Sequence, residues 1–515
     1  MELSQQAQPK HVAQRQFHIY NFVVTALMVV GSFGIGYAAA IIGTTLAQPS
    51  FISYFELDTR PDGTQLIATT NGLFFFGGVL GTVTISWLAD TWGRLWAIRI
   101  SGIISLLSSA LLAGSVHIGM FIAFRTVAGA GVFMMVAAVP MWISETAPPK
   151  NRGILADFHG IGILLGYSLS SYMGYAFYQL PHTDNMAWRG PFIVGCGPLA
   201  LHLIFTIWFP ESPRWLLLNG KREQAEKTLR RLHTPEEATI EMLQISAAME
   251  VDKQLDSSWL AMLKNPAYRK RALISSSVVV MVESSGLLVI NNYGPTIYSS
   301  LGFGVKEQLI YQMGFNTIEL GGGLLAVFII DRIARPKLIA IGLTAACSAL
   351  IVLAAILANF ATTPESLANP NRAALRAGVA MIYIYAFCVE WLLNGTMFAY
   401  MAELFPTHIR AKGLVVTITS LTAINILWTQ LAPTAFEAIG WKFYLCFIIP
   451  PMLYAVLVWF TFPNTLGLPL EEIARLFGDH EENFIQQQLN NPIQRMSEDK
   501  HANKFEQTIE VSDVA

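Results

Sequence analysis

Three glutamates, Glu283, Glu319 and Glu390, lie inside long apolar stretches of the sequence. If each stretch is a helix that rises about 1.5 Å per residue, each carboxyl group sits roughly 15–20 Å from the cytoplasmic end of its helix. A carboxyl group at that depth is costly when ionised, and burial disfavours its charged form. Such a group could exchange protons near neutral pH, bind a polar group of a solute, or simply stiffen a helix bundle as a neutral, hydrogen-bonded acid.

A second set of charged residues occurs twice, once in each half of the chain, and both of its acid-to-arginine spacings match between the halves. The set comprises Asp90, Arg94, Glu145 and Arg152 in the first half, and Asp331, Arg335, Glu403 and Arg410 in the second. An ion pair suits a cytoplasmic gate, because its strength depends steeply on separation and on access of water. The alternative is that these charges only anchor loops at the lipid headgroups. Their repetition favours the gate.

The elements that position these residues are apolar runs long enough to cross a bilayer. The chain is 53% hydrophobic and only 13% charged, which excludes a large soluble enzyme. The twelve predicted spans are 20–46, 66–88, 96–116, 120–143, 154–178, 189–209, 272–299, 309–330, 338–359, 378–403, 413–435 and 443–462. We therefore expect an all-α membrane protein with twelve transmembrane helices in two six-helix halves. An internal repeat of this kind is typical of secondary transporters.

Basic residues fix the expected orientation. They follow the even-numbered spans and are densest in the middle stretch, 210–271. Because basic loops stay in the cytoplasm, both termini should be cytoplasmic. The expected organisation is a cytoplasmic N-terminal tail (1–19), a first half (20–209), a cytoplasmic helical linker (210–271), a second half (272–462) and a cytoplasmic C-terminal tail (463–515). The plasma membrane is the default location.

The linker should hold two amphipathic helices, Arg222 to Leu232 and Glu236 to Lys253. Elsewhere the sequence offers little chemistry. Its four cysteines fall in apolar segments without metal-ligand spacing, and it has no nucleotide loop or nucleophile–base set. We expect no enzyme activity, cofactor, metal or nucleic acid. The expected partners are a small-molecule solute, the lipid bilayer and, if transport is coupled, protons, with one chain holding the whole pathway.

Several motifs carry a resemblance to the major facilitator superfamily, and within it to the sugar porter family. They are Leu88-Ala89-Asp90-x-x-Gly93-Arg94, Arg125-x-x-x-Gly129-x-Gly131, Ser144-Glu145-x-Ala147-Pro148-x-x-x-Arg152-Gly153, Pro210-Glu211-Ser212-Pro213-Arg214-Trp215-Leu216, Asp331-Arg332-x-x-Arg335, Glu403-x-Phe405-Pro406-x-x-x-Arg410-x-x-Gly413 and a degraded Pro463-x-Thr465-x-Gly467. The resemblance covers roughly residues 20–480. It implies the major facilitator fold and a solute site near mid-membrane between the halves.

Within that site the chain departs from the family. A Gln-Gln pair of the seventh span is replaced by Val282 and Glu283, and the Asn that follows is replaced by Leu288. The Gln of the fifth span falls at Gly160, after the retained His159. Several amides that would bind sugar hydroxyls are therefore missing. The solute-binding candidates that remain are Tyr37, His159, Glu283, Asn291, Asn292, Tyr293, Asn394, Phe398 and Asn425.

Proton coupling is open for a related reason. Proton-coupled sugar porters carry an Asp after Gly-Tyr in the first span, near the Arg of the fourth span. This chain has Ala38 at that position and keeps Arg125. Facilitators also lack the aspartate. Our hypothesis is that Glu283, or as second choice Glu390, replaces the missing acid or binds a polar group of the solute.

Three functions remain open from the sequence. The first is transport of a sugar, polyol or related hydroxylated compound by alternating access, as a facilitator or proton symporter. The second is export of a small organic metabolite. The third is nutrient sensing without transport. The sequence does not distinguish among them.

Overall fold

The computed structural model describes residues 19–146, 152–181, 184–234, 237–239, 241–243, 245–246, 249, 258–362, 369–406, 408–468, 473 and 476–478, with the backbone alone for 152–157. Its regular elements within these ranges are all helical. The predicted N-terminal tail, most of the C-terminal tail, and much of the predicted helix from Glu236 to Lys253 lie outside the described residues.

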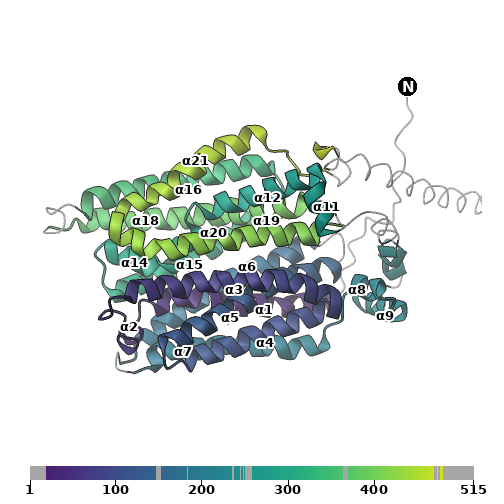
Figure 1. Ribbon diagram of the computed structural model, residues 1–515, viewed down its shortest axis with the longest axis horizontal. Helices are drawn as coiled ribbons and strands as arrows, with labels where there is room; N and C mark the ends of the chain where they lie inside the picture. The colour runs from purple at the N-terminus through teal and green to yellow at the C-terminus, as the bar shows by residue number, and fades with distance from the viewer. Residues whose placement is uncertain are drawn as a thin grey trace, which may run out of the picture.

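Six long helices of the first half pack side by side in the lower part of Figure 1. They are α1 (Ile19–Thr45), α3 (Gly63–Trp92), α4 (Arg94–Ala113), α5 (Ile118–Thr146), α6 (Arg152–Tyr178) and α7 (Met186–Phe205). Short α2 (Pro49–Tyr54) lies between the first two. The α1 helix packs chiefly on α6 and α7, and α3 packs on α5.

The second half forms the upper part of Figure 1. Its elements are α12 (Pro266–Glu283), α13 (Leu287–Asn292), α14 (Gly294–Ser300), α15 (Val305–Ala326), α16 (Arg335–Phe360), α18 (Arg372–Cys388), the π-helix η3 (Val389–Asn394), α19 (Gly395–Glu403), α20 (Arg410–Ile439), the short η4 (Gly440–Phe443) and α21 (Tyr444–Thr461). The two halves meet where α3 packs on α20 and α6 on α15.

Short helices from the linker gather at one end of the bundle, at the right of Figure 1. After η2 (Thr206–Trp208), these are α8 (Pro213–Leu218), α9 (Arg222–Leu232) and α11 (Trp259–Lys264). The predicted amphipathic helix from Arg222 to Leu232 is confirmed, with its apolar face covering Trp215 and Leu216 of α8. We call this end of the molecule the gate end.

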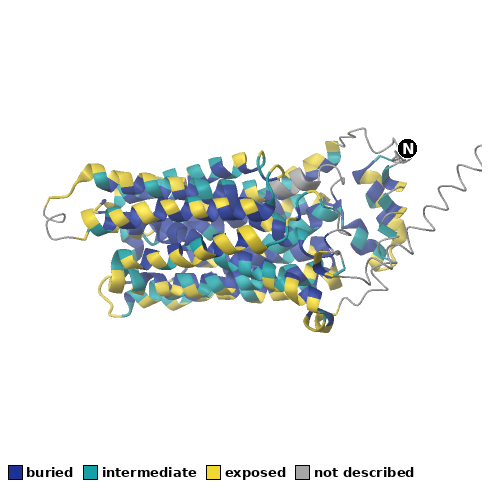
Figure 2. Cartoon of the chain, turned by 90° about the horizontal axis from the view of Figure 1, so that it is seen from above, coloured by how far each residue is buried: buried dark blue, intermediate teal, exposed yellow. Residues whose placement is uncertain are grey.

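Length and hydropathy single out nine candidate membrane spans among the described residues, one of which, Arg410–Thr461, contains both α20 and α21. The α6 and α15 helices fall outside these nine, yet both pack within the bundle. Residues coloured as exposed lie mainly on the outer faces and at the ends of the bundle, and buried ones lie along its inner faces (Figure 2). Because large apolar side chains such as Phe460 (79% exposed) and Leu273 (71%) are on that surface, a lipid bilayer must surround it. The protein is thus an all-α, multi-pass membrane protein.

The structure corrects the seventh predicted span, which we expected to be one helix over 272–299. It is broken twice. The α12 helix ends at Glu283, and Gly286 then takes a positive φ of 94° before α13 begins. A second break at Tyr293 separates α13 from α14. The tenth span is also irregular, because η3 inserts a π-helical turn between α18 and α19. Breaks of both kinds are typical of transport sites.

Candidate functional site

The three glutamates all lie in the second half and are buried. Glu283 is 4% exposed, Glu319 1% and Glu390 5%. Electrostatic interactions link Glu390 to both of the others, so the three form one group, which we call the carboxyl layer. Glu283 is the last residue of α12, beside the first helix break, and Glu390 lies within η3.

A glycine allows η3 to approach α15 closely. A Cβ atom added at Gly322 would lie 3.0 Å from the carbonyl oxygen of Phe387 and 3.1 Å from Cβ of Glu390. Contacts this short leave little room for any side chain at this position. Because Gly322 follows Glu319 by about one helical turn, the close approach brings Glu390 beside Glu319.

The three carboxyl groups differ in their hydrogen bonds. Glu319 Oε2 accepts from Asn291 Nδ2 at 3.1 Å. Both Glu390 oxygens accept from Asn394 Nδ2, at 2.9 and 3.1 Å. Glu283 faces the amide of Asn425, but its Oε2 atom is buried without a hydrogen-bond partner among the described residues. Glu283 is therefore the member with an open acceptor.

Polar side chains of α15 that we did not predict extend the layer. Gln312 Nε2 donates to the carbonyl of Asn291 at 3.2 Å and to Asn316 Oδ1 at 3.3 Å. Asn316 in turn joins the halves, because its Nδ2 donates to the Tyr167 carbonyl of α6 at 3.0 Å and its carbonyl accepts from Ser168 Oγ at 3.0 Å. These residues had a sequence signal that we missed, namely amides at helical spacing inside an otherwise apolar run.

In the first half, Arg125 is 1% exposed, and its hydrogen bonds within the described part of the chain go to carbonyls and not to a carboxylate. Its Nη1 and Nη2 atoms donate to the carbonyls of Ala38 at 2.7 Å and Ala39 at 2.9 Å. Its guanidinium lies over the ring of Phe74, 4.0 Å from the centroid. Ala38 stands at the position where the proton-coupled sugar porters that this chain resembles carry an aspartate, and Ala39 follows it. The cation is thus retained with backbone oxygens in place of the acid.

Other predicted solute-binding residues are largely occupied by contacts between helices. The Tyr37 hydroxyl donates to the Pro191 carbonyl at 2.8 Å, and the Tyr293 hydroxyl to the Thr429 carbonyl at 2.9 Å. His159 Nδ1 pairs with Ser32 Oγ at 2.6 Å, leaving Nε2 buried without a partner among the described residues. Asn292 is 6% exposed and Phe398 37% exposed. Of the predicted solute-binding residues, Glu283 belongs to the carboxyl layer, and Asn291, Asn394 and Asn425 contact its members.

At the gate end, the first charge cluster surrounds Arg94. Its guanidinium binds Glu145 at 3.1 Å and Asp90 at 3.2 Å, and it also donates to the Ala89 carbonyl at 2.9 Å. The Ser212 hydroxyl donates a short hydrogen bond to Glu145 Oε2. We define this first-half cluster as Asp90, Arg94, Glu145, Glu211 and Ser212.

Glu211 connects two segments of that cluster. Its carboxylate accepts from the backbone N–H of Leu95 at 3.1 Å and from its neighbour Ser212 at 2.8 Å, which ties the segment after α7 to the start of α4. Burial raises the pKa of Glu211, although these N–H donors and nearby Arg94 act to lower it. Ionisation of the Glu211 carboxyl group is therefore costly, and the N–H donors and Arg94 offset part of that cost.

The second charge cluster repeats the first. Arg335 binds Glu403 at 2.8 Å and Asp331 at 2.9 Å, and donates to the Ile330 carbonyl. The Thr465 hydroxyl donates to Glu403 Oε2 at 2.6 Å, in the place that Ser212 takes in the first half. We define this second-half cluster as Asp331, Arg335, Glu403 and Thr465. The hydroxyl partners lie in the two Pro-x-Ser/Thr segments, whose role sequence reasoning had not assigned.

Two gate candidates remain, Arg152 and Arg410. The Arg152 side chain lies outside the described part of the structure. Arg410 Nε donates to the Phe405 carbonyl at 3.2 Å, which fixes the turn before α20. The ion pairs of each cluster link helices of the same half.

Two helical halves with repeated charge clusters, broken helices and a buried polar layer inside the bundle define a secondary transporter of small polar solutes. A family model described as "Sugar (and other) transporter" matches residues 24–477, so the chain belongs to that family. The predicted sugar porter resemblance is confirmed.

Curated relatives agree. The chain is 26% identical to the MFS-type transporter criB of Aspergillus cristatus, over 92% of this chain and 96% of that protein. It is 28% identical to a probable quinate permease of Aspergillus fumigatus, over 89% of this chain and 88% of the relative. Among solved structures, the proton:xylose symporter XylE bound to 6-bromo-6-deoxy-D-glucose matches 89% of this chain and 99% of that one, with a TM-score of 0.73 and 24% identity. The major facilitator fold is thereby confirmed.

Proposed function

We propose that this protein carries a neutral, polyhydroxylated solute by proton-coupled alternating access, and that Glu283 is the group that exchanges the proton. The observation that carries this proposal is the unpartnered Oε2 atom of buried Glu283, at the end of a broken helix. A buried acceptor without a partner is costly, and a proton or a solute hydroxyl would remove that cost.

The chemistry of the layer favours a neutral solute. Carboxyl and amide groups both donate and accept hydrogen bonds when the acids are protonated, as hydroxyl groups do. A carboxylate solute would meet three glutamates instead, and the Arg125 Nη atoms that would attract it already bind two carbonyls. The relatives include proteins named for both kinds of solute. One is a probable quinate permease, named for a carboxylate, and XylE is a proton:xylose symporter, named for a neutral sugar.

The charge clusters supply the conformational part of the proposal. Each fixes helix ends of its own half at the gate end, so each half can move as a unit. Opening of the gate end would admit water and weaken the pairs. We assign the cytoplasmic gate to these residues, with both termini on the cytoplasmic side of the plasma membrane.

The test is uptake by the full chain in liposomes, using labelled xylose, glucose, a polyol and quinate, with and without an inward proton gradient. One pH unit is worth about 1.4 kcal/mol per proton, so coupling should accumulate the neutral solute up to about tenfold. The Glu283→Gln variant should still equilibrate solute but lose that accumulation. Glu319→Gln is the matched control, because its partner Asn291 can still bind an amide oxygen, and it should keep the gradient response.

Gradient-driven accumulation by Glu283→Gln would exclude the proton role. Uptake of quinate without any neutral solute would exclude the proposed solute class. Flux only in the outward direction, or solute binding without flux, would favour export or sensing instead.

A further inference from the structure

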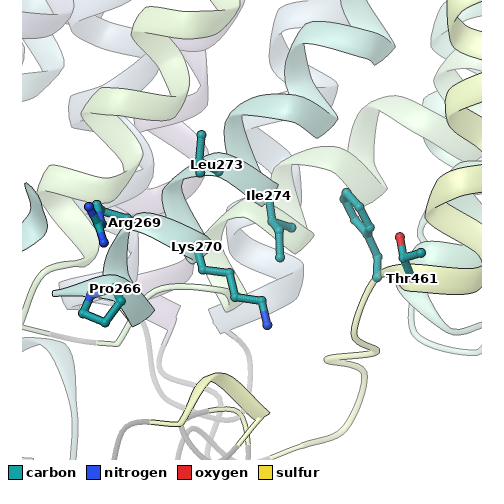
Figure 3. Close-up of a pocket in the computed structure, with 7 residues that line it drawn as sticks. Pro266, Arg269, Lys270, Leu273, Ile274 and Thr461 are labelled. Atoms are coloured by element: carbon teal, nitrogen blue, oxygen red, sulfur yellow. The ribbon is translucent and has the colours of Figure 1, made fainter.

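A groove between the start of α12 and the end of α21 opens at the gate end of the second half. Its volume is about 510 Å³, and it is lined by Pro266, Arg269, Lys270, Leu273, Ile274, Thr461 and Phe462. Figure 3 shows Lys270 reaching toward the space between the two helices, with Leu273 and Ile274 one turn further along α12. Two cationic side chains and several apolar side chains thus line the same groove.

Among the residues that the structure describes, neither Arg269 nor Lys270 forms an ion pair, and the first turn of α12 contains no acidic side chain. Both side chains are exposed, and the Lys270 ammonium lies 5.7 Å from the centroid of the Phe477 ring. Cations also repel the positive end of a helix dipole, so this placement is unfavourable unless an anion binds there.

The surroundings of the groove favour a lipid as the anion. Leu273 and the neighbouring Phe460 are among the most exposed apolar side chains of the molecule, which places the groove at the lipid-facing surface. The groove is at the gate end, where the polar linker helices lie and where the charge pattern predicts the cytoplasmic leaflet. A ligand in the groove would contact Arg269 and Lys270 with one end and apolar side chains with the rest of its length. Basic grooves between spans on that side match anionic lipid headgroups.

We propose that this groove binds one anionic phospholipid, with its phosphate between Arg269 and Lys270 and its first methylene groups on Leu273, Ile274 and Phe462. The site does not depend on the transported solute. It holds the first turns of α12, the helix whose last residue is Glu283, so bound lipid stabilises the end of α12 opposite the carboxyl layer.

The experiment is native mass spectrometry of the full chain, purified with mixed phosphatidylserine and phosphatidylcholine. The wild-type chain should retain one phosphatidylserine in preference to phosphatidylcholine. Because each cation near a membrane surface contributes roughly fivefold to anionic lipid binding, Arg269→Gln with Lys270→Gln should lower retention by at least about tenfold. Ile274→Trp, which fills the groove and keeps both cations, should cause a similar loss.

Lys264→Gln is the control, since Lys264 is an exposed cation at the same end that does not line the groove. An equal loss in that variant would show diffuse charge attraction and overturn the site. Displacement of the lipid by millimolar inorganic phosphate would overturn it too, as it would identify a free-anion site. Unchanged retention in the double variant would place the lipid elsewhere. All variants are compared as monodisperse protein, so that a folding defect is recognised.

Discussion

In the first-half charge cluster the carboxylate that binds the arginine is well buried, whereas its counterpart in the second half is partly exposed. Glu145 has 12% of its side chain exposed and Glu403 has 30%, although Arg94 and Arg335 are buried to a similar degree. Water therefore reaches the second pair more easily and screens it more. We therefore expect the same pair of residue types to be weaker in the second half than in the first.

A second difference concerns the segments that close each cluster. In the first half, Glu211 accepts the N–H of Leu95. In the second half, the equivalent of Leu95 is Pro336, which has no N–H to donate, and the equivalent of Glu211 is Asn464. Asn464 Oδ1 instead accepts from Leu466 in its own turn at 3.2 Å. The second half therefore has neither the N–H donor nor the carboxylate acceptor of this hydrogen bond, which in the first half connects Leu95 to Glu211.

The largest expected effect tests the difference in burial. Glu145→Ala leaves Arg94 buried beside an exposed aspartate and should lower the free energy of unfolding by about 3 kcal/mol. Glu403→Ala should cost about 1–2 kcal/mol, because water already reaches that site. Thermal unfolding of the purified protein in detergent measures both. Equal losses in the two variants would show that exposure of the glutamate does not set the strength of the pair.

A smaller effect tests the connection missing from the second half. Pro336→Leu supplies a backbone donor, and Asn464→Glu supplies an acceptor. Each alone should be neutral or destabilising by less than about 1 kcal/mol, because it lacks its partner. Together they should be more stable than the sum of the single changes by about 1 kcal/mol, as measured by a double-mutant cycle. Simple additivity would mean that the two segments cannot meet as Glu211 and Leu95 do.

The smallest effect concerns the pH dependence of Glu211. Because its pKa is raised in the folded protein, its ionisation above that pKa costs stability, while its protonated form at lower pH does not. Glu211→Gln has no such ionisation. The difference in melting temperature between the variant and the wild-type chain should therefore shift by a few degrees in favour of the variant as the pH rises from 5 to 8. A shift in the opposite direction would mean that the N–H donors outweigh burial.

The sequence predicted the charge clusters well, because acids and arginines at helix ends are close in sequence and occur twice. Arg94 with Asp90, and Arg335 with Asp331, are pairs one helical turn apart that any helix would bring together. Their hydroxyl partners, Ser212 and Thr465, come from segments far along the chain. Their contribution depends on tertiary packing, which local spacing cannot show.

The sequence predicted that the three glutamates of the carboxyl layer lie at a similar depth, but not which side chains they contact. Counting residues along each helix placed Glu283, Glu319 and Glu390 near one level. It did not reveal that α12 stops at Glu283, although Ser284, Ser285 and Gly286 offer a signal for a break. Nor did it reveal the π-helical turn at Glu390, since π-helices have no strong sequence signal. These irregularities distinguish the three acids, and only the structure displays them.

Arg125 has a consequence for how the protein responds to electrical potential. Its charge lies within the membrane-spanning part of α5 and is bound by carbonyls, and no carboxylate of the described residues forms a hydrogen bond with it. A membrane potential of 100 mV acts on one buried charge with about 2.3 kcal/mol if that charge crosses the whole field. In the proposed alternating access, rocking of the first half would move Arg125 through part of that field. Turnover should therefore respond to voltage even when the solute itself is uncharged.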